Sequence, residues 1–186
     1  MKRLSRWLPL AVPLLVSACG YNTIQTMDET AAAARQQIEV QLQRRADLVP
    51  NLVATVQGFA AQEAEIFTAV ADARSRLAGA VTGGSMAQMA DANQQMTGAL
   101  GRLLAIAEAY PQLKSDQNFL RLQDELSGTE NRIAVARTDY NNAVRDYNAY
   151  IRRFPQVLTA KVTGAKAREY FEVTNPDNRE APKVRF

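Results

Sequence analysis

Residues 119–154 carry the pattern that decides the fold, and they read FLRLQDELSGTENRIAVARTDYNNAVRDYNAYIRRF. Mostly apolar or aromatic side chains recur here at alternating steps of three and four residues, which places them on one face of an α-helix. That face consists of Phe119, Leu122, Leu126, Thr129, Ile133, Ala136, Tyr140, Ala143, Tyr147, Tyr150 and Phe154. The other face carries charged residues such as Arg121, Asp124 and Arg132. A seam this regular predicts one long helix that is buried against other helices.

Three upstream segments show the same spacing. Their stripes are Ile24, Met27, Ala31, Ala34, Ile38 and Leu42; Leu52, Val56, Phe59, Glu63, Ile66, Val70, Ala73 and Leu77; and Met86, Met89, Asn93, Met96, Leu100, Leu103, Ala107 and Tyr110. Pro50, the stretch 79–84 and Pro111 separate the segments. An antiparallel, up-and-down four-helix bundle with long helices buries four such stripes most simply, so we predict an all-α fold. Alternatively, Pro50 only kinks one long helix.

Local signals predict where the later helices begin and end. Ser85 and Gln88 have the spacing of a capping box, which opens the third helix. Pro111 ends that helix, because proline cannot continue the hydrogen-bond ladder. Ser115 or Asp116 can then cap the fourth helix, since both side chains accept hydrogen bonds from free N–H groups.

The first twenty residues have the order of a secretory signal: a basic region, an apolar run at Trp7–Val16 and then small residues. The apolar run is ten residues long, whereas a membrane-spanning helix needs roughly 20. The sequence Val16-Ser17-Ala18-Cys19 resembles a bacterial lipobox. That resemblance implies cleavage between Ala18 and Cys19 and attachment of diacylglycerol to the Cys19 thiol. Acyl chains, at about 0.8 kcal/mol per buried CH₂, then hold a soluble domain on a membrane.

The same residues also fit a plain signal peptide or an uncleaved anchor with an incidental cysteine. We favour the lipobox because Cys19 is the only cysteine of the chain and stands where the motif needs it. Gly20 follows it, and in Gram-negative cells an acidic residue at that position favours retention in the inner membrane. Gly20 therefore favours the outer membrane, with the body facing the periplasm or the exterior.

These features divide the chain into four predicted parts. They are a signal peptide at 1–18, a lipid-anchored linker at 19–23, the helical bundle at 24–154 and an irregular C-terminal tail at 155–186 that packs partly on the bundle. Gly164, Pro176 and Pro182 interrupt the tail, which has apolar islands at Tyr170-Phe171 and Val184–Phe186. The tail also holds more Lys and Arg than acids, which permits a weak contact with anionic lipid; a solvated tail is the favoured alternative.

The composition excludes several classes of catalytic and metal-binding site. The chain has no histidine and one cysteine, so intramolecular disulfides, thiolate metal clusters and histidine-based catalysis are ruled out. We accordingly predict no catalytic residues, no cofactor and no metal site. Removing the three basic side chains of the first 18 residues from the total of 22 leaves 19 against 19 acidic ones. A neutral body gives no electrostatic reason to expect nucleic-acid binding.

Several polar residues fall within the apolar stripes. Glu63 stands in one, and a buried carboxylate needs a partner, for which Arg44, Arg45 and Arg74 are candidates. The functional alternative is an acid with a raised pKa at a cleft. Asn93 interrupts the third stripe, and a single buried amide often specifies helix pairing.

Two other groups have a structural and a functional interpretation. The tyrosines and the asparagines interleaved with them could form a partner surface, since tyrosines are enriched at interfaces. The helical spacing of the tyrosines favours a place in the bundle core instead. This group is Tyr140, Asn141, Asn142, Tyr147, Asn148 and Tyr150. Met86, Met89 and Met96 could line an adaptable groove for a partner helix, but we favour the interpretation that they are core residues.

The sequence resembles the LemA family over roughly residues 21–186. The resemblance is carried by Asp47-Leu48-Val49-Pro50-Asn51-Leu52, Ala109-Tyr110-Pro111-Gln112-Leu113-Lys114, Asn118–Leu126, Thr129–Ile133, Tyr140-Asn141, Tyr147-Asn148, Phe154-Pro155, Tyr170-Phe171-Glu172 and Pro182–Phe186. It implies a membrane-anchored helical bundle that faces away from the cytoplasm, and it implies no reaction. Many members have an N-terminal transmembrane helix, from which this chain departs by its lipobox.

We therefore expect a non-catalytic scaffold or adaptor that presents helical surface to another envelope protein. One alternative is a ligand-binding lipoprotein, which needs an apolar cavity in the bundle with convergent polar groups. Another is a carboxylate-based enzyme, which needs two acids about 5 to 9.5 Å apart across a cleft.

Overall fold

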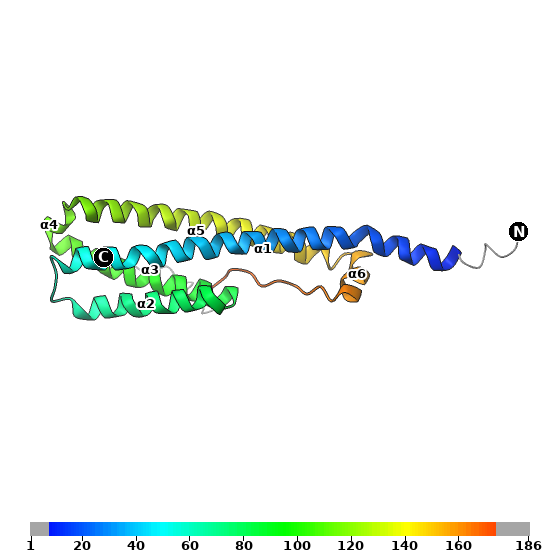
Figure 1. Cartoon of the computed structure of the whole chain (residues 1–186), viewed down its shortest axis with the longest axis horizontal. Coiled ribbons are helices and arrows are strands. Elements are labelled where there is room, and N and C mark those ends of the chain that lie inside the picture. The colour runs from blue at the N-terminus through cyan, green and yellow to red at the C-terminus, as the bar shows by residue number, and fades with distance from the viewer. Residues whose placement is uncertain (1–7, 174–186) are drawn as a thin grey trace, which may run out of the picture. The chain divides into compact units, whose positions relative to one another are not determined.

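A computed structural model describes the backbone of residues 8–173 and the side chains of residues 20–173. Within these residues the chain is helical and has no strand, so the predicted all-α class is confirmed. The helices are α1 (Leu8–Gln57), α2 (Ala64–Gly83), α3 (Met86–Ala109), α4 (Pro111–Lys114), α5 (Gln117–Tyr150) and α6 (Gln156–Thr163), as Figure 1 shows. The side chains of Ala18 and Cys19, together with Pro176, Pro182 and Val184–Phe186, lie outside the described residues. What was predicted for them stays a prediction.

Contacts divide the described chain into two compact units. The first unit consists of the chain up to Gln36 together with Thr138–Glu169. The second unit consists of Gln37–Arg137 together with the segment from Tyr170 on. The helices α1 and α5 each contribute one part to either unit. Each core is therefore closed by packing between segments that are far apart in the sequence.

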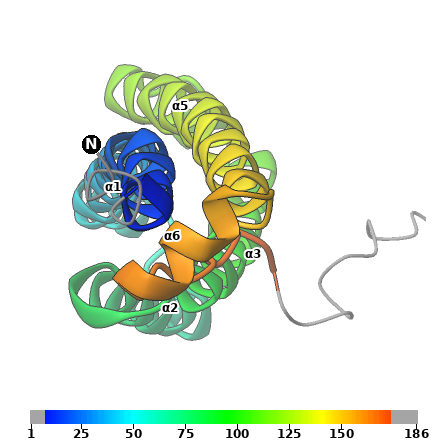
Figure 2. The same cartoon turned by 90° about the vertical axis from the view of Figure 1, so that its right-hand side faces the viewer.

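In the second unit four helical segments lie side by side (Figure 1, Figure 2): residues 37–57 of α1, then α2, α3 and residues 117–137 of α5. Their buried side chains follow the predicted spacing. They include Ile38, Leu42, Leu52, Val56, Val70, Leu77, Met86, Met89, Met96, Leu103, Phe119, Leu126 and Ile133. Burial of such side chains, at about 1.5–3 kcal/mol each, is the main favourable term in folding. The methionines belong to this core, as the structural interpretation predicts.

Pro50 does not separate two helices, and the alternative of one long helix is confirmed, because α1 continues through Pro50 to Gln57. Proline has no N–H, so the carbonyl of Ala46, four residues earlier, loses its helical hydrogen bond. The Nε atom of Arg74 in α2 donates to Ala46 O at 2.9 Å. A side chain from the neighbouring helix thus replaces the missing donor and allows α1 to continue.

The chain instead turns at residues 58–63, which removes two residues from the predicted second stripe. Phe59 lies in the turn and is 37% exposed. Glu63 is half-buried at the N-cap position of α2, where its side chain makes no capping hydrogen bond. The prediction of a carboxylate buried within an apolar helix seam is therefore wrong for Glu63. Arg45 and Arg74, two of its predicted partners, contact other groups.

The predicted starts of α3 and α5 are confirmed. Ser85 accepts from the Gln88 N–H at 3.2 Å, and the Gln88 side chain accepts from the Ser85 N–H at 2.8 Å, which completes the capping box. A Cβ on Gly84 would lie 2.6 Å from the carbonyl oxygen of Ala80, so only glycine fits this turn. Asp116 caps α5 by accepting a backbone N–H at 2.9 Å.

The first unit has its own apolar cluster, which consists of Ile24, Tyr147, Ile151 and Ala160. Ala160 belongs to α6, a two-turn helix that Gly164 ends at a φ of 73°. The prediction of an irregular tail is therefore wrong for residues 156–163. Phe154 is 81% exposed, so the apolar seam of α5 stops before this residue, where the prediction had placed its last member.

Candidate functional site

A buried polar cluster in the second unit is centred on Arg45, which is 4% exposed. Its Nη1 atom donates to Asn93 Oδ1 at 2.6 Å and lies 2.6 Å from Glu130 Oε2. Burial lowers the pKa of Arg45, because a charge loses hydration inside the protein, while the nearby Glu130 carboxylate opposes that shift. Asn93 thus joins α1 to α3, and the prediction of a buried amide with a structural role is confirmed.

The hydrogen bonding of this cluster is incomplete. Arg45 Nε, Gln41 Oε1 and Glu130 Oε2 are buried and have no hydrogen-bond partner among the described residues. The contact between Arg45 and Glu130 is therefore an ion pair in which the N–H does not point along a hydrogen bond to the carboxylate. Buried charges with imperfect pairing add little net stability but disfavour other helix registers. We therefore expect the cluster to restrict how the helices pair.

In the first unit Arg168 fastens the segment after α6. Its Nε atom donates to Asp28 Oδ1 at 2.7 Å, and both its backbone groups bond to the Asn148 side chain at 2.9 Å. The hydrogen bond from Arg168 holds the pKa of Asp28 below its usual value. The segment that follows α6 is thereby held against both α1 and α5.

The tyrosines of α5 are packed in the same unit. Tyr140 and Tyr147 are each 2% exposed, and Tyr150 is half-buried. The Tyr140 hydroxyl donates to the carbonyl of Glu169 at 2.8 Å. Burial raises the pKa of both Tyr140 and Tyr147. The interpretation of these tyrosines as core residues is confirmed for the first two, whose buried rings are not available as a partner surface.

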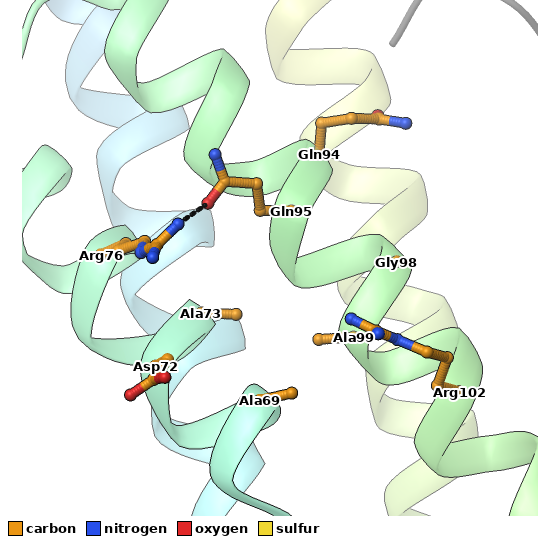
Figure 3. Close-up of a pocket in the computed structure, with 9 residues that line it drawn as sticks. All are labelled: Ala69, Asp72, Ala73, Arg76, Gln94, Gln95, Gly98, Ala99 and Arg102. Carbon is orange, nitrogen blue, oxygen red and sulfur yellow. Dashed lines mark hydrogen bonds between the residues drawn. The ribbon is translucent and has the colours of Figure 1, made fainter. Parts of the chain in front are cut away.

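A groove open to solvent runs between α2 and α3 on the second unit, with a volume of about 460 Å³. Figure 3 shows Ala69, Ala73 and Ala99 pointing toward one another across it. Arg76 Nη1 donates to Gln95 Oε1 at 3.0 Å and links the two helices at one end. The floor is made of small side chains, and the rims carry arginines and glutamines.

A second groove of about 580 Å³ shares Arg76 and Gln95 with the first, so the hollow continues toward the α2–α3 turn. Small residues line it as well; they are Gly79, Ala80, Gly83, Gly84 and Ala92. Both grooves lie on the surface and are lined by polar and small residues. They do not fit the apolar interior cavity that the ligand-binding alternative needs.

The acids of the described residues are dispersed. No group of three His, Cys, Asp or Glu residues stands close enough to hold a metal ion there. One carboxylate lines each groove, Asp72 in the first and Asp91 in the second. Neither groove therefore supplies the pair of facing acids that a carboxylate-based hydrolase needs.

The residue after the predicted lipid-attachment point borders α6. A Cβ on Gly20 would lie 3.4 Å from Gln156 Cγ and 3.7 Å from Thr159 Oγ1. Gly20 is the residue after Cys19, so the beginning of the predicted mature chain packs on α6. Among the described residues, no helix combines the length and the apolar character that crossing a bilayer requires.

The sequence alone gave no reason to select the groove residues or the ion pair of Arg168 with Asp28. These two partners are 140 residues apart, and Arg168 lies in a segment without periodicity. The rim arginine Arg76 looks like any solvated residue on the polar face of an amphipathic helix. Only the arrangement of the helices brings these side chains together.

Comparison with known proteins identifies related sequences. The model of the LemA family matches residues 34–186. Magnetosome proteins MamQ 2 and MamQ 1 of Paramagnetospirillum magneticum are each 34% identical, over 82% of this chain and 64% of their own length. Magnetosome protein MamQ of Magnetospirillum gryphiswaldense is 33% identical over 81% of this chain and 64% of its own length. The matched part thus falls short of two thirds of each of these relatives.

Proposed function

The chain belongs to the LemA family, and on that premise we propose that it is a membrane-anchored envelope lipoprotein that acts as a non-catalytic adaptor. In this proposal, cleavage after Ala18 leaves Cys19 as the first mature residue, and acyl chains on its thiol tether the body to a bilayer. The helical body, as an up-and-down bundle, presents its surface to another envelope protein. Gly20 in the sorting position favours the outer membrane.

The α2–α3 groove is the observation that carries the adaptor role. Its floor of alanine and glycine lets the backbone of another helix approach closely, since ridges of one helix pack into grooves of another. Arg102 and Gln94 on its rim supply donors for polar groups on that helix. We propose that the occupant is an α-helix of a partner envelope protein that lies along this groove.

The relatives support a role in an assembly. They are named for the magnetosome and not for a reaction. The dispersed carboxylates point in the same direction, because no pair of acids faces across either groove. An open groove lined by polar and small residues is suited to binding another protein.

Site-specific crosslinking in cells tests the adaptor role. A photoreactive phenylalanine analogue replaces Gln94 or Arg102 on the groove, and Arg132, exposed on α5, as the matched control. We expect both groove positions to capture the same protein, identified by mass spectrometry, and the Arg132 position not to capture it. If the groove positions yield no reproducible partner, or the control captures the same protein, the proposed surface is wrong.

The tether is tested separately. Mass spectrometry of the N-terminal peptide should show an acylated Cys19, and the Cys19→Ser variant should stay unprocessed or leave the membrane fraction. Density-gradient separation of the two membranes then tests the outer-membrane assignment. If Cys19→Ser is processed and located as the parent is, with no acyl group on either, the lipoprotein proposal fails.

A further inference from the structure

Three exposed apolar side chains lie on α6 and in the turn that precedes it; they are Phe154, Leu158 and Val162, and we call them the apolar ridge. Their exposed fractions are 81%, 53% and 89%, and Val162 and Phe154 are the two most exposed large hydrophobic side chains among the described residues. A step of four residues places Leu158 and Val162 on one side of α6, and Phe154 lies in the turn that precedes the helix. Single exposed apolar residues are normal, but three of them within nine residues mark a candidate surface for contact with something apolar.

Basic side chains flank this ridge in the sequence. From residue 147 to residue 168 the sequence has no acid and five bases. One of them, Arg168, is engaged with Asp28. The other four are exposed; they are Arg152, Arg153, Lys161 and Lys166. An apolar ridge among cations is complementary to a surface with anionic phosphates above hydrocarbon.

The inner face of α6 holds the ridge in place. Ala160 is 4% exposed and packs in the cluster with Ile24 and Tyr147. Thr159 is buried beside Gly20. The ridge is therefore presented outward by a helix that is packed against residues 20–24 of α1.

The place of the predicted anchor strengthens the argument. Consecutive Cα atoms are about 3.8 Å apart. The Cα atom of Cys19 therefore lies about that far from the Cα atom of Gly20, which packs against α6. A bilayer that holds acyl chains attached to Cys19 must lie close to this end of the first unit. Such a tether raises the effective concentration of lipid at α6, so that even a weak contact is populated.

We propose that α6 docks on an anionic phospholipid surface. The three ridge side chains enter the boundary between headgroups and acyl chains, while Arg152, Arg153, Lys161 and Lys166 contact lipid phosphates. The proposal rests on the proposed lipoprotein function for its tether only. The docked α6 fixes the orientation of the first unit on the membrane, which a flexible lipid attachment alone does not.

Fluorescence quenching of the full chain in vesicles tests the docking. The only tryptophan is Trp7, in the predicted signal, so Trp7→Phe combined with Leu158→Trp gives a single reporter on the ridge. Val135→Trp is the matched control, because Val135 is an apolar side chain of α5 that is 61% exposed. Vesicles contain phosphatidylcholine and phosphatidylglycerol with brominated acyl chains, which quench tryptophan on contact.

We expect the Leu158→Trp variant to lose most of its emission and the Val135→Trp variant to lose little. Adding Arg152→Glu and Arg153→Glu should restore much of the lost emission, as should replacing phosphatidylglycerol by phosphatidylcholine. Circular dichroism checks that each variant is folded, and these exposed positions leave the core intact. Equal quenching of the two reporters overturns the proposal. So does quenching of the ridge reporter that changes neither with the arginine-to-glutamate substitutions nor with the charge of the lipid.

The mass of the N-terminal peptide from the same preparation separates the two proposals. An acylated Cys19 with no quenching of the ridge reporter overturns docking and leaves the tether. An unmodified Cys19 with strong, charge-dependent quenching overturns the tether and supports docking. A ridge covered by a partner protein instead of lipid would also leave the reporter unquenched, and so counts against the proposal.

Discussion

Two arginines, one in each unit, show opposite ways of placing a charge in a helical protein. Arg45 in the second unit is 4% exposed, and its Nε atom has no hydrogen-bond partner among the described residues. The side chain of Arg168 in the first unit is 26% exposed and bonded to Asp28. Burial lowers the pKa of Arg45, whereas the hydrogen bond to Asp28 raises that of Arg168.

The two arginines therefore serve different structural purposes: Arg45 restricts how helices pair, and Arg168 attaches a chain segment. The Arg45 cluster places a charge where hydration is lost, so its partners are needed to tolerate it and the pairing of helices is restricted. Arg168 keeps part of its hydration, and its ion pair and backbone bonds attach a chain segment that lacks an apolar stripe. Substitutions should therefore be costly in the first case and mild in the second.

The largest effect is expected for Glu130→Ala. This variant leaves the buried Arg45 without its counter-charge, which destabilises by about 3 kcal/mol, near the lower end of the range for breaking a buried pair because the Glu130 side chain is 47% exposed. Arg45→Met should cost less, since it removes the buried charge and leaves a carboxylate that water can reach. Urea unfolding followed by circular dichroism measures both, with Glu125→Ala, at an exposed position on the same helix, as the control. If Arg45→Met is the costlier of the two, the cluster contributes net stability and the comparison is wrong.

The second effect concerns how Arg74 allows Pro50 to stay within α1. Arg74→Met removes the donor to the Ala46 carbonyl and should destabilise by about 1.5–3 kcal/mol, the value of a hydrogen bond to a charged group. Pro50→Ala restores a backbone N–H for the same carbonyl. In that background Arg74→Met should cost measurably less, and the double-mutant cycle gives the coupling free energy. Additive effects of the two changes would contradict the replacement of one donor by the other.

Much of the fold could be predicted from the sequence, because helical periodicity is a local signal. The capping box at Ser85 and the cap at Asp116 needed only neighbouring residues, and both formed. The continuity of α1 through Pro50 was one of two alternatives that the sequence left open, since the choice depends on Arg74 from another helix. Glu63 was misplaced for the same reason, because moving the turn to residues 58–63 took it out of the stripe.

The candidate sites were less predictable than the fold. The lipobox predicted at Cys19 is a linear motif that the sequence alone can suggest, and it stays a prediction. The groove of α2 and α3 depends on which polar faces are brought together. α6 escaped detection because a helix of eight residues is too short to show a repeating apolar stripe. Short helices are recognised by their tertiary contacts and not by their periodicity.

A smaller effect is expected where Asn148 holds the Arg168 backbone. Asn148→Ala removes two hydrogen bonds to the segment after α6 and should destabilise it by about 1–2 kcal/mol. The loss should be local, so amide hydrogen exchange at Arg168 should accelerate while that of the second unit stays unchanged. Asn142→Ala, at an exposed position on the same helix, is the control. A slowed or unaltered exchange at Arg168 would show that other contacts hold the segment.

The smallest effect is the pH dependence of the pair between Asp28 and Arg168. The pKa of Asp28 is lowered in the folded state, chiefly by the hydrogen bond from Arg168, so the folded state favours the carboxylate. This contribution is fully present above the ordinary pKa of 3.8 and is lost as the pH falls through the lowered value.

Because the Asp28 side chain is 40% exposed, water and salt screen the pair, and we expect about 0.2–1 kcal/mol from it. The difference in unfolding free energy between the parent and Asp28→Asn should thus be constant near neutral pH, shrink below the ordinary pKa, and vanish below the lowered pKa of the folded state. Comparing the two variants cancels the titration of every other acid. A difference that persists in strong acid would mean that Asp28 acts through packing and not through its charge, and the contrast with the buried Arg45 would then rest on geometry alone.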